Sequence, residues 1–166
     1  MTRLFVIAVV LVLSSPMRAD EQTAKPTVYT AAQAAAGRTA YQSVCVNCHT
    51  EALTGRKGEP GERPPLDSLP ADVQNYVQVS IGKIPPLAGP QFMARWGART
   101  TTDLSERIKI AISGFPPKDV NERTSLLLTA YFLQVNGAIP GAEELTASTA
   151  VTLKTIVPTG AIPERD

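Results

Sequence analysis

The stretch SVCVNCHTEA, residues 43–52, decides how the rest of this chain is interpreted. It contains both cysteines of the 166-residue sequence and its only histidine, arranged as Cys45, Cys48 and His49 in the pattern C-x-x-C-H. On a helix the two thiols would lie about one turn apart, with the imidazole directly after the second thiol. This spacing lets both thiols add to the two vinyl groups of one porphyrin while the histidine reaches the iron. The sequence therefore predicts one covalently attached haem c, with Cys45 and Cys48 as thioether anchors and His49 as proximal ligand.

Three other interpretations of the motif stay open. A redox-active dithiol is typical of a βαβ context, whereas the residues around this motif favour helix and loop. A zinc site needs four ligands, and with no other Cys or His in the chain only carboxylates could complete it. A disulfide between Cys45 and Cys48 is the third alternative, because exported chains enter an oxidising compartment.

The first 19 residues have the features of a secretory signal peptide. Arg3 supplies the positive charge, residues 4–13 form an apolar run, and residues 14–19 are mostly small or polar and end at Ala19. The apolar run is about half of the ~20 residues needed to cross a bilayer, so a permanent anchor is not expected. We expect a periplasmic protein, with membrane contact only if this segment stays uncleaved.

Composition excludes some classes of function. Cleavage after Ala19 would remove two arginines and leave one more acidic than basic residue, so no basic patch supports nucleic-acid binding. A hydrophobic fraction of 43% permits a packed core. The 14 prolines and 11 glycines favour short helices joined by long irregular connections.

Helical patterns occur on both sides of the motif. Thr30 can cap a helix over residues 31–44, in which Gly37 predicts the close approach of another element. A late helix is predicted over residues 122–135, because Asn136-Gly137 is a typical C-terminal stop.

Two shorter helices are predicted between these two. Residues 91–96 are helix-like, and Asp103 caps or starts a helix whose apolar stripe is formed by Leu104, Ile108 and Ile112. The predicted fold class is all-α, a small domain of three to five short helices and long loops around one haem.

The remaining segments complete the domain organisation. Residues 20–30 are expected to be a loose leader, residues 31–137 the haem domain, and residues 138–166 a tail that wraps its surface. Within the domain, residues 54–70 are dense in Gly, Pro and charge and are expected to be loop. Residues 56–84, which lie between the haem motif and the PPLAG of residues 85–89, look like an insertion. The insertion is either a decorated loop or a docking surface for an electron-transfer partner.

The chain resembles the monohaem class I cytochrome c family over residues 31–137. Gly37, Tyr41 and Cys45 are similar in spacing to the Gly, aromatic and first Cys of that family, and the AYFL of residues 130–133 is similar to its C-terminal helix. The resemblance implies that Gly37 lets Tyr131 or a neighbour pack where the two helices cross.

A narrower resemblance is to the cytochrome c domains that serve quinoprotein alcohol dehydrogenases. It is carried by PPLAGPQFMARWG, residues 85–97, and NGAIPGAEEL, residues 136–145. It implies that the carbonyl of Pro85 accepts a hydrogen bond from the proximal histidine, with Pro64 in a second P-x-L as the alternative. It also implies that Leu87 lies at the haem. The Trp96 indole would donate to a haem propionate or be an ordinary core aromatic.

The sequence departs from the family at the distal ligand. The usual methionine position is occupied by Ile112, and the nearest similar step, at Phe115, has no sulfur. Met93 is the only methionine outside the signal peptide and is either a distal ligand or core filler. A lysine, Lys109 or Lys118, is a further candidate. The remaining alternative is an open distal side lined by Ile112 and Phe115.

These alternatives lead to two expected functions. A held distal ligand suits an exported electron carrier that transforms no substrate of its own and has a redox partner such as a quinoprotein dehydrogenase. An open apolar site suits binding or sensing of small neutral ligands such as CO or NO. Peroxidase-like catalysis is a weaker third candidate, since the sequence offers no distal histidine as an acid–base group.

Overall fold

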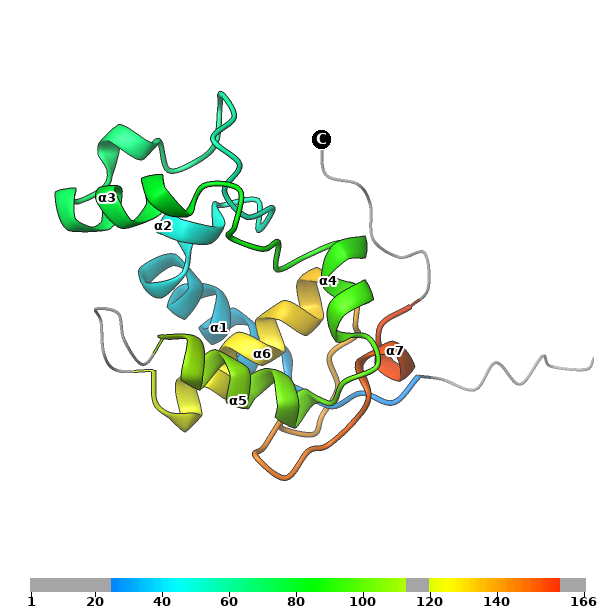
Figure 1. Cartoon of the computed structure of the whole chain (residues 1–166). Coiled ribbons are helices and arrows are strands. Elements are labelled where there is room, and N and C mark those ends of the chain that lie inside the picture. Colours follow the sequence, from blue (N-terminus) through cyan, green and yellow to red (C-terminus); the bar gives the residue numbers. More distant parts are fainter. Residues whose placement is uncertain (1–24, 113–119, 159–166) are drawn as a thin grey trace, which may run out of the picture.

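The computed structural model of the chain describes residues 25–112 and 120–158. These residues confirm the all-α class, and they contain no strands beyond two isolated bridges. In Figure 1, α1 (Ala31–Val44) and α6 (Glu122–Val135) cross at the centre, and α5 (Thr101–Ile112) lies alongside α6. The other elements are α2 (Val46–His49), the 3-10 helix η1 (Leu66–Ser68), α3 (Ala71–Ser80), α4 (Pro90–Trp96) and α7 (Leu153–Ile156).

The expected three to five helices are too few, because the described residues form seven α-helices. Two of the additional ones, α2 and α7, are single turns of four residues, too short to show a period. The third, α3, forms in a stretch of ambiguous period within the insertion.

The crossing of α1 and α6 is built as the sequence predicts. Thr30 and Gln33 form a reciprocal capping box at the start of α1, and Asn121 caps α6. At the contact point, a Cβ on Gly37 would collide with the backbone carbonyl of Leu127 and press on the Cβ of Tyr131. Glycine is therefore required for the two backbones to approach this closely, and the prediction for Gly37 is confirmed.

The start of α5 differs from the prediction. Thr100, and not Asp103, caps the helix: its hydroxyl accepts from the backbone N–H of Asp103, and the Asp103 carboxylate accepts from the backbone N–H of Thr100 at 2.8 Å. Asp103 sits in the first turn as the third residue of the helix. The carboxylate thus completes a capping box from within the first turn, and the helix begins about one turn earlier than expected.

The insertion is folded, and a backbone hydrogen bond joins its two ends. The Gly82 N–H donates to the Arg56 carbonyl at 3.0 Å, which joins its first and last turns. Between them lie η1 and α3, and the Gln74 side chain donates to the carbonyl of Leu66. In Figure 1 the insertion lies beside α2, at the end of the molecule opposite α7.

The tail wraps the domain, over the part that the structure describes. Backbone N–H groups of Leu153 and Lys154 donate to the carbonyls of Arg99 and Gly97, and Leu145 exchanges hydrogen bonds with the side chain of Gln33. Buried side chains of α7, Leu153 and Ile156, complete this contact.

The expectation of a loose leader is wrong for its last residues. Val28 and Tyr29 are buried, and the Tyr29 hydroxyl donates to the carbonyl of Ala138 at 2.5 Å. The returning tail, which no local pattern reveals, covers this segment. The predicted signal peptide, residues 1–19, lies outside the described residues. Among the described residues, no helix combines the length and apolar character that crossing a bilayer requires.

Candidate haem-binding site

The C-x-x-C-H motif lies at the junction of α1 and α2. Cys45 ends α1 and begins α2, and its carbonyl accepts from the backbone N–H groups of Cys48 and His49 at 3.2 and 2.9 Å. Cys45 is buried, Cys48 is partly buried, and neither sulfur is in a disulfide. The helical turn brings two unbonded thiols and the imidazole to one short segment. Thioether attachment of a haem with histidine ligation requires these three groups.

The His49 ring is held by Pro85. Its Nδ1 lies 2.9 Å from the carbonyl oxygen of Pro85, a residue 36 positions away. A carbonyl can only accept, so Nδ1 carries the proton and the neutral ring leaves the lone pair of Nε2 for a metal. Burial lowers the pKa of His49, and the hydrogen bond to Pro85 offsets part of that effect. The ring is therefore kept neutral and oriented, as a ligand to iron must be.

The contact implied for Pro85 is thus present, and the alternative, Pro64, contacts a different group. The carbonyl of Pro64 accepts from Arg56, at 2.8 Å. Pro85 is brought to the histidine by Gly55, which has a φ of 73° and packs so closely that a Cβ there would collide with the Ile84 carbonyl. Glycine meets both demands, a left-handed backbone and space for the Ile84-Pro85 segment.

The segment after Pro85 is anchored from two sides. The Leu87 N–H donates to the Leu53 carbonyl at 2.8 Å. The buried side chain of Asn136 donates to the Leu87 carbonyl at 3.1 Å and accepts from the Gly89 N–H at 3.0 Å. The two stretches that carry the narrower resemblance, residues 85–97 and 136–145, therefore meet at Asn136. Its role could be suspected only from that resemblance.

Both thiols are held in their neutral form. Burial raises the pKa of the Cys45 thiol to about 12, and the neighbouring Cys48 adds to this rise. Burial also raises the pKa of Cys48, although the positive charge of Arg56 partly opposes it. A reactive dithiol needs a lowered thiol pKa, so the environment of this pair disfavours the dithiol alternative. In the described ranges, no three Cys, His, Asp or Glu side chains converge as metal ligands, so the zinc alternative gains no support.

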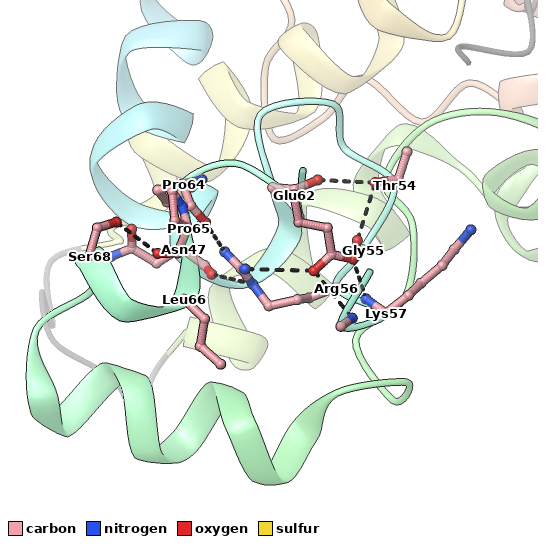
Figure 2. Close-up of polar contacts among 12 residues, drawn as sticks. Asn47, Thr54, Gly55, Arg56, Lys57, Glu62, Pro64, Pro65, Leu66 and Ser68 are labelled. Atoms are coloured by element: carbon pink, nitrogen blue, oxygen red, sulfur yellow. Dashed lines mark hydrogen bonds and ion pairs between the residues drawn. The ribbon is translucent and has the colours of Figure 1, made fainter. Parts of the chain in front are cut away.

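Arg56 is the site residue that sequence reasoning missed. Its side chain is only 2% exposed and lies against α2: Nε donates to the Asn47 carbonyl at 3.1 Å, between the two cysteines. Figure 2 shows the guanidinium between Asn47, Pro64 and Glu62. Its Nη1 lies 3.6 Å from Oε2 of Glu62. Within a run of Gly, Pro and charged residues, nothing local distinguishes a buried arginine from solvated ones.

Trp96 and Met93 lie on α4, away from any contact with the motif that the structure records. Trp96 is partly buried, packs 6.4 Å from Phe92 between ring centroids, and has the guanidinium carbon of Arg99 5.5 Å above its ring. Met93 is partly buried, and its side chain packs against the hydrophobic core. These contacts favour the core-filler interpretation of Met93.

Of the four other residues considered for the distal side, two lie in α5 and two lie outside the described residues. Ile112 is the last residue of α5. Lys109 is on the surface of α5, where its Nζ lies 2.6 Å from Oε1 of Glu106. Phe115 and Lys118 lie outside the described residues.

Comparison of the chain with protein-family models, with curated proteins and with solved structures finds no match. The site is therefore interpreted from its own geometry.

Proposed function

We propose that this chain is an exported monohaem c-type cytochrome that carries single electrons. The observation that supports this most strongly is the 2.9 Å contact between Nδ1 of His49 and the Pro85 carbonyl, next to two unbonded thiols one turn apart. Haem would be attached through Cys45 and Cys48 with His49 as proximal ligand, and when bound it supplies a one-electron iron couple.

The chain's own residues then have defined tasks. The Pro85 carbonyl accepts a hydrogen bond from Nδ1–H and so would fix which nitrogen of His49 is available to the metal. Gly55 and Asn136 hold the Pro85 segment in place from opposite ends. The protein transforms no substrate in this proposal. A periplasmic dehydrogenase, of the quinoprotein kind, is the proposed partner, and this part of the proposal rests on the resemblance carried by residues 85–97 and 136–145.

A second candidate, binding of CO or NO at an open distal side, is supported by a different observation. Two of the candidate distal ligands have other contacts in the structure: Met93 packs against the hydrophobic core, and Lys109 pairs with Glu106. Ligation by Met93 would require it to leave the core, and ligation by Lys109 would require it to leave an exposed ion pair.

The test is the visible spectrum of the ferrous protein, produced with a haem c maturation system, before and after adding carbon monoxide. Covalent haem that survives denaturation, and its loss when Cys45→Ala and Cys48→Ala are combined, would support attachment; a haem-free protein would overturn the proposal. A low-spin spectrum unchanged by the gas favours the electron carrier, and Met93→Ala then tests that sulfur. A rapid shift to a carbonyl spectrum favours the gas-binding candidate.

A further inference from the structure

Arg56 has an unusual environment for a charged residue. It is the largest of the fully buried side chains, and burial of a guanidinium is tolerated only with partners. Two of its nitrogens donate to the carbonyls of Asn47 and Pro64, at 3.1 and 2.8 Å, and a third lies 3.6 Å from Glu62. The Glu62 carboxylate is fixed in turn by the backbone N–H groups of Lys57 and Gly58, at 2.6 and 3.2 Å.

These contacts join segments that the sequence separates. Asn47 belongs to α2, within the C-x-x-C-H motif, whereas Glu62 and Pro64 belong to the first half of the insertion (Figure 2). The backbone carbonyl of Arg56 accepts from Gly82 at the other end of the insertion. One residue thus binds the motif and both halves of the insertion.

Arg56 is also adjacent to the group that carries Pro85. Gly55 precedes it and packs directly against Ile84 and Pro85. The Gly55 N–H donates to the His49 carbonyl at 3.3 Å. A displacement of Arg56 would therefore move Gly55, and with it the carbonyl that His49 needs.

We propose that Arg56 is a positioning residue for His49, because it clasps the insertion onto α2 and so keeps the Pro85 carbonyl within hydrogen-bond distance of Nδ1. The clasp itself is a property of the polypeptide. Its effect on the iron rests on the proposed function. Lysine is not an equivalent replacement, since one ammonium cannot reach three partners in the planar arrangement of a guanidinium.

The first readout needs no haem. Limited proteolysis within residues 56–84 should be on the order of tenfold faster in Arg56→Lys than in the wild-type protein, because charged hydrogen bonds are lost while the charge is kept. Lys83→Gln, which alters an exposed charge in the same segment, should be cleaved at the wild-type rate. Equal rates for Arg56→Lys and the wild-type protein would overturn the clasp.

The second readout is the reduction potential of the haem-loaded protein. A weakened Nδ1–H to carbonyl bond makes the imidazole a poorer donor to ferric iron, so the potential should rise in Arg56→Lys. We expect up to about tenfold in the electron-exchange constant, which is about 59 mV for one electron. Gly55→Ala, which displaces Pro85 without touching the arginine, should raise it in the same direction, and Lys83→Gln should not.

The outcomes separate the two proposals. An unchanged potential in Arg56→Lys, together with a raised one in Gly55→Ala, would overturn the positioning role while leaving the cytochrome intact. A wild-type chain that takes up no haem would overturn the proposed function and the effect on His49. The proteolysis result would then still decide whether the clasp exists.

Discussion

The crossing of α1 and α6 and the insertion at residues 56–84 are held together in opposite ways. The crossing is apolar and close-packed: Tyr41 lies 5.5 Å from Tyr131 and 6.0 Å from Phe132 between ring centroids, and Leu128 is fully buried. The insertion buries only three of its side chains, Arg56, Leu69 and Val77, and depends on hydrogen bonds to backbone carbonyls.

The difference indicates which region carries the global stability and which region can open locally. Apolar burial contributes roughly 25 cal/mol per Å² and is additive over a large interface, so the crossing should carry the global stability. A polar clasp contributes little net energy but fails sharply when one partner is removed. The insertion should therefore open as a local unit, and in our proposal the contact between His49 and Pro85 depends on it.

The largest expected effect tests this division directly. Leu128→Ala should lower the free energy of unfolding by about 3 kcal/mol, because it leaves a cavity in the apolar core to which α6 contributes. Val77→Ala, in a residue equally buried within the insertion, should lower it by less than about 1 kcal/mol, since the insertion opens separately. Urea denaturation followed by far-ultraviolet circular dichroism measures both. Equal losses would show that the two regions unfold as one unit.

The close approach at Gly37 gives the next largest effect. Gly37→Ser should cost about 2 kcal/mol, because its Cβ would meet the Leu127 carbonyl and force the helices apart. Ala36→Ser places the same side chain on the exposed face of the same helix and serves as the control. Thermal unfolding of the two variants gives the comparison. A stable Gly37→Ser protein would mean that the crossing tolerates a wider separation.

A third prediction concerns the contact between the leader and the tail. Burial raises the pKa of Tyr29 to about 12, above its ordinary value of about 10, so the folded state holds the phenol proton more tightly than the unfolded state. Stability from this group is complete below pH 10 and is lost as the pH rises from 10 to 12. The loss should be on the order of 1 kcal/mol at pH 11. Urea denaturation at pH 9 and 11 should show a smaller decline in Tyr29→Phe than in the wild-type protein; identical declines would contradict the prediction.

The smallest expected effect is at the start of α5. Hydrogen bonds from the backbone and side chain of Thr100 lower the pKa of Asp103, so its contribution is present above the ordinary carboxyl pKa. That contribution should fade as the pH falls through the lowered value. Asp103→Asn should remove this acid-side dependence and slightly lower the melting temperature at neutral pH. A melting temperature equal to that of the wild-type protein from neutral to acid pH would rule the cap out as a contributor.

Helices with strong local signals were predictable to the residue. The boundaries of α1 and α6 match because Thr30 and the Asn136-Gly137 step act within one turn. The errors occurred where partners lie far away in the chain. Tyr29 is buried beneath the tail. Helix α3 has an ambiguous sequence period and forms where it packs beside η1 and α2.

The candidate site divides in the same manner. The motif alone predicts the chemistry of Cys45, Cys48 and His49, because thiols and imidazole are brought together by one helical turn. Pro85 was predicted only through a resemblance, and the structure has its carbonyl at Nδ1. Arg56 was not predicted, because its burial results from three carbonyl and carboxylate partners that come together only in the folded chain.

By itself, therefore, the sequence determined the helix class, the central crossing and the donor set of the motif, all of which depend on contacts within a few residues or on a required glycine. Only the tertiary structure decided which proline carbonyl contacts His49, which residues surround Met93 and Lys109, and which contacts hold the insertion in place. The physical reason is the range of the interactions: capping, periodicity and thiol spacing are local, whereas a buried polar contact exists only after distant segments have met.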